Sequence, residues 1–317
     1  MNEPTTLYIV VPCYNEDLVL SETAKRLCAK LDALIALQKV SAKSRILFVN
    51  DGSTDSTWQL IEALHKESPL ISGLNLSRNR GHQNALLAGL HHAESRCDAA
   101  ISMDADLQDD IDAIDEMLRH FLDGCDIVYG VRAKRTRDSF FKRTTAEGFY
   151  RVMKFLGASI VFNHADYRLM SARALGALRE YKEVNLFLRG IVPLLGYKTE
   201  TVTYERAERY AGETKYPLRK MISFAAQGIT SFSSKPLRMI TSLGTLIFLA
   251  SIVMILYSLV RHFMGQTSSG WTSLICSIWA IGGLILLSLG VVGEYIAKIY
   301  LEVKARPSYH IDEVLED

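Results

Sequence analysis

The sequence lacks the features that mark several common classes of protein. Its 317 residues include five cysteines without the spacing of a metal site, and their odd number argues against a disulfide framework. The formal net charge is +1, which gives no electrostatic reason to expect nucleic acid as a partner. The N-terminus has neither the basic start nor the apolar stretch of a signal peptide. We therefore expect the polar part of the chain to lie in the reducing cytoplasm.

A glycine-rich phosphate-binding loop is also missing from the first predicted strand-to-helix turn. Residues 7–11 form an apolar run that predicts a buried strand ended by Pro12. The loop that follows contains Tyr14 and Glu16 where a dinucleotide-binding turn needs glycines. An acidic loop repels a diphosphate unless a cation lies between them. The usual dinucleotide-binding turn is therefore excluded.

Strand and helix patterns alternate through the first half of the chain. We expect strands at residues 7–11, 45–50, 71–76, 99–103 and 126–130. We expect helices around residues 20–34, from residue 56, at 81–93 and at 111–122. This alternation predicts an α/β fold with a mostly parallel sheet covered on both faces, and ligands beyond the carboxyl ends of the strands.

Two carboxylates follow the fourth predicted strand. In an extended backbone residues i and i+2 point to the same side, so Asp104 and Asp106 can converge at the strand end. Carboxylate oxygens suit Mg²⁺ or Mn²⁺ bridging a diphosphate. The alternative is an acidic pair on a solvated loop. The place at the end of a strand favours the metal.

Two long stretches without charged residues lie in the second half, at residues 239–260 and 263–293. Each is long enough to cross a bilayer, which takes about 20 apolar residues. We expect a hairpin of two transmembrane helices with a loop around residues 265–271; the alternative is two buried helices of a soluble core. Basic residues flank the hairpin on its outer ends, whereas the loop side has only Arg261 and His262. This asymmetry predicts that both termini are cytoplasmic.

The composition thus predicts four parts. They are an α/β domain at residues 1–215, an amphipathic segment at 216–238, the transmembrane hairpin at 239–297 and a cytoplasmic tail at 298–317. The second part mixes apolar with basic residues, as segments in the membrane interface do. An amphipathic helix packed on the sheet is the alternative for this segment.

Several motifs, taken in order, resemble the family 2 glycosyltransferases with the GT-A fold. They are VPCYNE at residues 11–16, NDGSTD at 50–55, SRNRGHQ at 77–83 and DADLQD at 104–109. More narrowly, DYRLM at 166–170, ERAERYAGETKYPL at 205–218 and the two-span tail resemble the polyprenyl-phosphate glycosyltransferases. That group includes the bactoprenol glucosyltransferases of O-antigen modification and the dolichol-phosphate mannose synthases. Two residues depart from its pattern: Arg80 replaces an aromatic residue and Asp110 a proline.

The resemblance implies a set of donor-binding residues. Those expected to line the nucleotide are Pro12, Tyr14, Glu16, Asp51, Asp104 and Ala105. Asp104 and Asp106 would hold the cation on the donor diphosphate, where it neutralises charge on the leaving group. For two of these residues an alternative to nucleotide binding stays open. Asp51 could be only a turn residue, and Glu16 could be only a favourable charge at a helix N-terminus.

The resemblance also implies an anionic acceptor, a lipid phosphate, which can attack without losing a proton. Asp166 occupies the place where relatives with hydroxyl acceptors carry a general base; its other role is to orient Arg168. Guanidinium groups suit phosphate oxygens. The cations expected to bind the acceptor phosphate are Arg132, Arg135, Arg168, Arg206, Arg209 and Lys215. They face anionic lipid headgroups in the alternative interpretation.

The expected catalytic set is therefore Asp104, Asp106, Asp166, Arg132 and Arg206. His82 and Gln83 open a predicted helix and either contact the ligand or cap and pack the helix. The implied reaction is an inverting transfer of a hexose, glucose from UDP-glucose, to polyprenyl (undecaprenyl) phosphate at the cytoplasmic face of the inner membrane. The partners are then the nucleotide sugar, the polyprenyl phosphate and the lipid bilayer, with a homo-oligomer left open.

Three other functions remain as alternatives. One is a membrane-anchored scaffold or sensor that binds nucleotide sugar without turnover. Another is a processive polysaccharide synthase, although those enzymes carry a Gln-x-x-Arg-Trp motif and no tryptophan here follows an arginine. The third is transport of the lipid-linked sugar by the hairpin, which two spans without internal charge support poorly.

Overall fold

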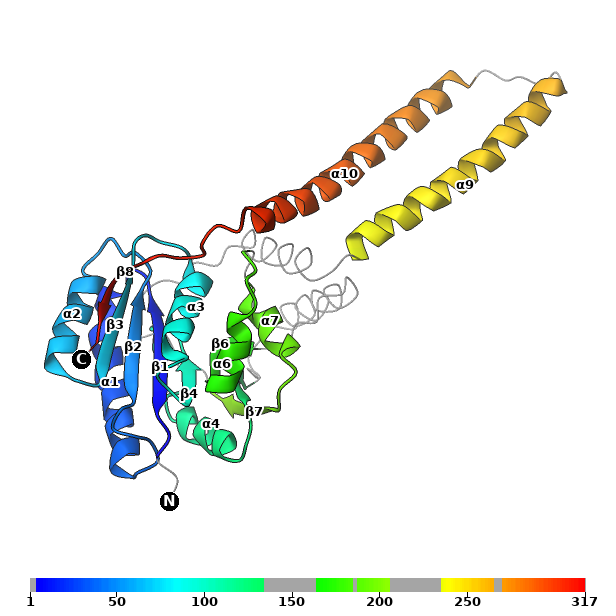
Figure 1. Cartoon of the computed structure of the whole chain (residues 1–317). Coiled ribbons are helices and arrows are strands. Elements are labelled where there is room, and N and C mark those ends of the chain that lie inside the picture. Colours follow the sequence, from blue (N-terminus) through cyan, green and yellow to red (C-terminus); the bar gives the residue numbers. More distant parts are fainter. Residues whose placement is uncertain (1–3, 134–163, 185–186, 206–234, 265–269, 317) are drawn as a thin grey trace. The chain divides into compact units, whose positions relative to one another are not determined.

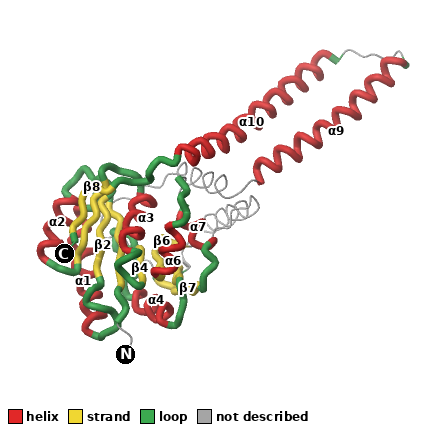
Figure 2. Tube along the Cα trace, in the orientation of Figure 1, coloured by secondary structure: helices red, strands yellow, loops and turns green. Residues whose placement is uncertain are grey.

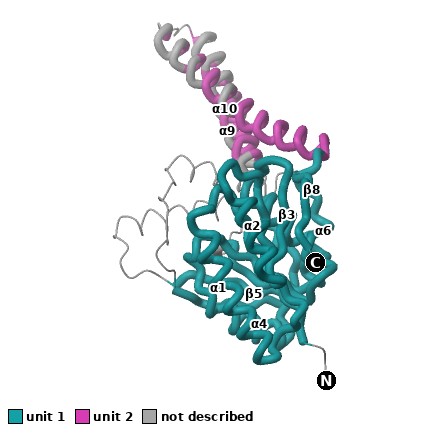
Figure 3. The backbone as a smooth tube through the Cα atoms, turned by 90° about the vertical axis from the view of Figure 1, so that its left-hand side faces the viewer, with its two compact units in different colours: residues 1–140, 160–216, 306–317 teal, residues 141–159, 217–305 magenta. Residues whose placement is uncertain are grey.

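The computed structural model of the chain describes residues 4–133, 164–184, 187–205, 235–264 and 270–316. The chain forms two compact units, which Figure 3 distinguishes. The first unit holds a β-sheet with its covering helices and includes residues 306–317 at the C-terminus. The second unit holds two long helices.

The described residues of the first unit contain one mixed sheet, with strand order β7-β5-β6-β4-β1-β2-β3-β8 (Figure 1). Its strands are β1 (Leu7–Cys13), β2 (Arg45–Asn50), β3 (Ile71–Leu76), β4 (Ala99–Ser102), β5 (Ile127–Arg132), β6 (His164–Ser171), β7 (Thr199–Tyr204) and β8 (Ile311–Leu315). β1 pairs in parallel with β2 and β4, and β2 pairs in parallel with β3. β6 runs antiparallel to β4 and β5. The predicted α/β fold with a mostly parallel sheet is confirmed.

Helices cover both faces of this sheet (Figure 2). They are α1 (Asp17–Ala36), α2 (Thr57–Glu67), α3 (His82–Ala93), α4 (Ala113–Leu122), α6 (Ala172–Arg179) and α7 (Leu188–Leu194). Successive residues of β1 point to opposite faces. Ile9 joins the buried cluster that includes Leu27 of α1, whereas Val10 meets α3. A Cβ added at Gly89 of α3 would lie 2.4 Å from Val10 Cγ1, so this glycine permits the close packing of α3 on the sheet.

β1 continues through Pro12, although we expected the proline to end the strand. β4 pairs with β1 only from Leu7 to Val10, while β2 pairs with β1 as far as Cys13. Pro12 therefore has a neighbouring strand on one side only, and proline is tolerated at such a position. The extra residues carry the following loop further beyond the end of β4.

The C-terminal residues add an edge strand that the sequence analysis did not anticipate. β8 pairs antiparallel with β3, and Leu315 packs against the buried core. Beside it, the Tyr309 hydroxyl lies 3.0 Å from His91 Nδ1 of α3, and Arg96 Nε lies 3.0 Å from Glu316 Oε1. Residues 306–317 are thus part of the first unit.

The second unit contains α9 (Lys235–Phe263) and α10 (Trp271–Lys304). The loop that we expected around residues 265–271 falls between them. Among the described residues, the segment Ile281–Lys304 has the length and mean hydropathy, 1.7, needed to cross a membrane, and none of it is buried within the chain. The amphipathic segment predicted at 216–238 lies outside the described residues as far as residue 234.

Candidate active site

The loops after β1 and β2 are locked together at the carboxyl edge of the sheet. Asn15, with φ +54°, donates its backbone N–H to Ser53 Oγ at 3.0 Å. Its side-chain carbonyl accepts the Thr54 N–H at 2.9 Å. The Glu16 N–H donates to Thr57 Oγ1 at 3.0 Å. These bonds fix the two loops relative to each other.

The residues predicted to hold the nucleotide come from three strand ends. Pro12 lies in β1, Tyr14 and Glu16 follow β1, Asp51 follows β2 and Ala105 follows β4. Tyr14 is 46% exposed, whereas Asp51 and Ala105 are buried. Their roles toward a nucleotide stay predictions.

The Asp51 carboxylate organises the neighbouring loop. It accepts the backbone N–H groups of Arg80 at 2.7 Å and of Gly81 at 2.9 Å. Burial raises the pKa of Asp51, and the two hydrogen bonds act against this shift. Gly52 has φ +63°, and a Cβ there would lie 2.4 Å from the Asn79 nitrogen. Asp51 therefore has a structural part in this turn, and its role toward a nucleotide stays a prediction.

The acidic loop after β4 carries Asp104 and Asp106. Thr23 of α1 holds it by donating its hydroxyl to the Ala105 carbonyl at 2.8 Å. Within the loop, the Gln108 N–H donates to Asp106 Oδ1 at 3.2 Å. Both carboxylates therefore belong to a loop that is fixed to the body of the domain.

The charge of Asp104 is poorly stabilised by the chain alone. Burial raises its pKa to about 6, and the carboxylates of Asp109, Asp166 and Asp106 add to the shift while His82 opposes it. A divalent cation would relieve this cost, so the residues present fit such an ion. The described residues gather no group of three or more potential ligands, so that within this part of the chain the diphosphate and water would complete the coordination of the ion.

Asp166 on β6 is the centre of a cluster of cationic groups. It accepts from Arg168 Nη2 at 2.8 Å, from Arg189 Nε at 3.2 Å and from Arg189 Nη2 at 3.0 Å. His82 Nε2 lies 3.5 Å from Asp166 Oδ2 and 3.6 Å from Asp104 Oδ1. The ring of His82 therefore connects the acidic loop to this cluster.

These contacts determine the protonation of Asp166. Burial alone would raise its pKa, but His82, Arg189 and Arg168 hold the pKa well below its usual range. A carboxylate stabilised in this way is a weak base. Arg168 is 2% exposed, so its burial favours the role of holding Asp166 over contact with a lipid phosphate.

Arg132 joins the acidic loop through Tyr204. The Tyr204 hydroxyl donates to Asp109 Oδ1 at 2.5 Å, and Arg132 Nε donates to the Tyr204 oxygen at 3.3 Å. Arg132 Nη2 lies 3.7 Å from Asp109 Oδ1. This cluster connects the ends of β5 and β7 to the loop that carries Asp104.

The structure brings part of the predicted set together and adds residues to it. Asp104, His82, Asp166 and Arg168 form one connected group, and Arg132 reaches the same acidic loop. The other predicted cations, Arg135, Arg206, Arg209 and Lys215, lie outside the described residues.

Sequence reasoning missed Arg189 and Tyr204, which lie in no motif that we recognised. Asp109 falls inside the DADLQD motif, and that motif was its only signal. Gln83 has a structural role here, because its Oε1 accepts the Leu188 N–H at 2.9 Å and fixes the start of α7.

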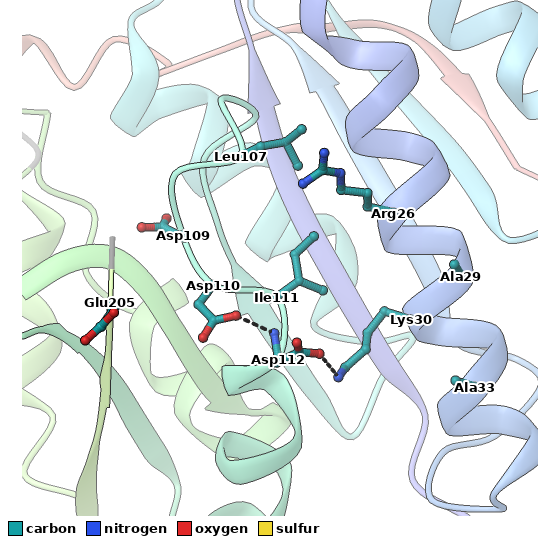
Figure 4. A pocket seen from close by; sticks show the side chains of 10 residues that line it. All are labelled: Arg26, Ala29, Lys30, Ala33, Leu107, Asp109, Asp110, Ile111, Asp112 and Glu205. Atoms are coloured by element: carbon teal, nitrogen blue, oxygen red, sulfur yellow. Dashed lines mark hydrogen bonds and ion pairs between the residues drawn. The ribbon is translucent and has the colours of Figure 1, made fainter. Parts of the chain in front are cut away.

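A cavity of 790 Å³ opens between α1 and the acidic loop (Figure 4). Lys30 of α1 lines it and forms ion pairs with Asp112 at 2.7 Å and Asp115 at 2.5 Å. The Asp109 carboxylate lies on the side of the loop away from α1. Because both lining cations already form ion pairs, Arg26 with Glu22 and Lys30 with Asp112, we do not place the donor in this cavity.

The sequence of the chain matches a known enzyme family. Residues 8–179 match the family described as "Glycosyl transferase family 2", and residues 235–299 match the "GtrB C-terminal hairpin". The chain belongs to glycosyltransferase family 2, as its motifs implied. The hairpin match and the apolar segment of α10 together indicate a membrane-associated chain.

Similar proteins cover nearly the whole chain. It is 53% identical over 306 residues to "Uncharacterized glycosyltransferase YkoT" of Bacillus subtilis (strain 168), covering 96% of this chain and 91% of that protein. It is 39% identical over 311 residues to "Prophage bactoprenol glucosyl transferase homolog" of Escherichia coli (strain K12), covering 96% and 98%. It is 40% identical over 309 residues to "SfII prophage-derived bactoprenol glucosyl transferase" of Shigella flexneri, covering 96% of each chain.

Proposed function

We propose that this enzyme transfers one hexose, glucose from UDP-glucose, to the phosphate of polyprenyl (undecaprenyl) phosphate with inversion at the anomeric carbon. The observation that carries the proposal is the state of Asp166. This carboxylate, at the place where relatives with hydroxyl acceptors carry a general base, is paired with Arg168 and Arg189 and faces the ring of His82, and these contacts hold its pKa well below its usual range. An acceptor that is already anionic needs no base and gains from cations. The names of the bactoprenol glucosyl transferase relatives support the same acceptor.

The proposed reaction is a single displacement. A phosphate oxygen of the acceptor attacks the anomeric carbon, and the bond between that carbon and the donor diphosphate breaks. The electron pair leaves with the nucleoside diphosphate, and no proton has to be removed from the acceptor. Arg132, held by Tyr204 and Asp109, is proposed to bind acceptor phosphate. Arg206 is proposed to act with it.

A divalent cation, Mg²⁺ or Mn²⁺, is proposed at Asp104 and Asp106. When bound, such a cation acts as a Lewis acid that neutralises the charge developing on the leaving diphosphate. The raised pKa of half-buried Asp104 supports this assignment, because the chain alone stabilises the charge poorly. Asp104 and the other strand-end residues, Pro12, Tyr14, Glu16, Asp51 and Ala105, are proposed to bind the nucleotide.

We further propose that α9 and α10 both cross the inner membrane, with the termini and the first unit on the cytoplasmic side. The distribution of basic residues around the two helices supports this orientation. Membrane anchoring keeps the site near an acceptor that stays in the bilayer, which reduces the entropy lost when the substrates meet. Assembly into a homo-oligomer stays a prediction.

The test uses the full chain in detergent with undecaprenyl phosphate, Mg²⁺ or Mn²⁺, and a panel of radiolabelled UDP- and GDP-sugars. We expect label from UDP-glucose in the organic phase, none with a chelator or with Asp106→Ala, and a β-linked product from the α-linked donor. Label from another donor would correct the sugar. Binding of nucleotide without organic-phase label from any donor would refute the transferase proposal and favour a scaffold or sensor.

A further inference from the structure

We propose that Arg189 contacts the acceptor phosphate and that Asp166 is the residue that positions it. This inference rests on the proposed function, because it names a binding group for the acceptor of that reaction. It goes beyond the sequence motifs, since Arg189 lies in none of them.

The contact between the two residues is a fork. Arg189 Nε donates to Asp166 Oδ1 at 3.2 Å and Nη2 donates to Asp166 at 3.0 Å, so the plane of the guanidinium is fixed. Asp166 is 7% exposed, whereas the Arg189 side chain is 45% exposed. One edge of the guanidinium therefore faces a buried carboxylate while the side chain as a whole is accessible to a ligand. A cation held in this way loses little side-chain entropy when it binds a phosphate.

The backbone that carries Arg189 is also fixed. Arg189 is the second residue of α7, and Gln83 of α3 accepts the N–H of Leu188 at 2.9 Å. Leu188 and Ile191 on the same short helix are buried. Two independent attachments, one to α3 and one to β6, thus hold the guanidinium in place. Such support is what a binding group needs and a solvent-exposed surface arginine does not.

The position of Arg189 suits the acceptor better than the donor. A path of contacts connects Asp104 to Arg189 through His82 and Asp166. His82 Nε2 lies 3.6 Å from Asp104 Oδ1 and 3.5 Å from Asp166 Oδ2, and Asp166 Oδ2 lies 3.0 Å from Arg189 Nη2. Along this path, two side chains lie between Arg189 and the carboxylate proposed to hold the donor diphosphate. In a displacement the attacking oxygen and the leaving group lie on opposite sides of the reacting carbon. A fixed cation displaced from Asp104 fits the attacking phosphate.

The competing explanation is that Arg189 only neutralises the buried charge of Asp166. That role would affect folding and the use of both substrates, whereas a phosphate contact affects the acceptor selectively. The chain contains a matched control in Arg173, which donates to Asp126 with the same two groups, Nε at 3.2 Å and Nη2. Arg173 is 66% exposed and belongs to α6.

The experiment measures initial rates of the full chain in detergent with undecaprenyl phosphate and the sugar donor that the wild type uses. Arg189→Gln should raise the KM for undecaprenyl phosphate by about 10- to 100-fold, the effect of losing a hydrogen bond to a charged group. The KM for the nucleotide sugar should change by less than about twofold. Arg189→Lys should raise the acceptor KM by less, because a point charge replaces a fork. Arg173→Gln should behave as wild type.

A cycle with Asp166→Asn tests the positioning role. If Asp166 acts on the acceptor through Arg189, adding Arg189→Gln to Asp166→Asn should raise the acceptor KM by less than about twofold further. Full additivity would refute the positioning role.

Each remaining result has a defined meaning. An unchanged acceptor KM in Arg189→Gln, or an equal rise in the KM of both substrates, would overturn the inference while leaving the proposed function intact. If Arg189→Gln does not fold, as judged by its thermal unfolding, Arg189→Lys with a wild-type acceptor KM overturns it instead. Absence of lipid product from the wild type would refute the proposed function, and this inference with it.

Discussion

Tyr204→Phe removes a single oxygen atom from the site and tests how Arg132 is held. In the wild type the Tyr204 hydroxyl donates to Asp109 Oδ1 at 2.5 Å and accepts from Arg132 Nε at 3.3 Å. Asp109 is 3% exposed, and its other oxygen has no hydrogen-bond partner among the described residues. The variant leaves Asp109 with Arg132 Nη2 at 3.7 Å as its remaining side-chain partner in this cluster.

The expected loss follows from the charge on Asp109. A hydrogen bond to a charged group contributes about 1.5–3 kcal/mol, and a buried carboxylate cannot replace it with water. We therefore expect Tyr204→Phe to lower the free energy of unfolding by about 2 kcal/mol. Arg132 loses its fixed orientation, so the KM for the lipid phosphate should rise more than the KM for the nucleotide sugar.

The assay combines denaturant unfolding of the detergent-solubilised chain with initial rates in both substrates. Tyr197→Phe is the control, because it removes a hydroxyl from a ring that packs against Arg173 at 4.6 Å outside this cluster. A change below about 0.5 kcal/mol in Tyr204→Phe, with both KM values unchanged, would show that the cluster does not hold Arg132.

Three further predictions concern other parts of the first unit. Burial lowers the pKa of His91 from 6.5 to about 4, so between these pH values the unfolded chain binds more protons and the folded state loses stability as the pH falls. Between pH 6.5 and about 4, the free energy of unfolding of the wild type, measured with denaturant, should fall by up to about 3 kcal/mol more than that of His91→Gln. Equal pH dependence of the two proteins would contradict this prediction. Gly52→Ala should destabilise the fold by at least about 2 kcal/mol and weaken nucleotide binding, since φ is +63° and the new Cβ would meet the backbone at Asn79. Gly124→Ala is its control, because φ is +84° but nothing lies within 4 Å, so a loss of only about 1 kcal/mol is expected, and equal losses would refute the steric argument. Deleting residues 306–317 removes β8 and should make β3 accessible to limited proteolysis under native conditions; an unchanged cleavage pattern would show that β8 contributes nothing to the sheet.

The parts of the fold that the sequence predicted have local signals. Apolar runs such as residues 45–50 are buried strands because the sheet is covered on both faces, and Asp104 lies two residues beyond the end of another such strand, β4. β8 has no comparable signal. Its sequence, IDEVL, carries two acidic residues, and its pairing partner β3 lies far earlier in the chain. An edge strand of this kind is stable only in the context of the finished sheet.

The site, like the fold, contains residues that have a local sequence signal and residues that have none. Residues in recognisable motifs, such as Asp104 after β4 and Asp166 on β6, were predicted from the sequence, and the structure places them in one connected group. Arg189 was missed because its importance depends on a contact with a carboxylate 23 positions earlier, made from a short helix that contains Pro193. Pairings of this kind follow from the folded arrangement, and no local pattern encodes them.

The arrangement of α3 suggests why the C-terminal residues return to the sheet. The first residues of α3 serve the site, since His82 lies between Asp104 and Asp166 and Gln83 fixes α7. The last residues of α3 hold the C-terminal segment, through His91 with Tyr309 and through His92 with Glu316. α10 continues directly into that segment along the chain. One buried helix therefore supports the site at one end and the chain leaving the hairpin at the other. The C-terminal segment is thus attached to the same helix whose first residue, His82, lies between the two carboxylates of the site.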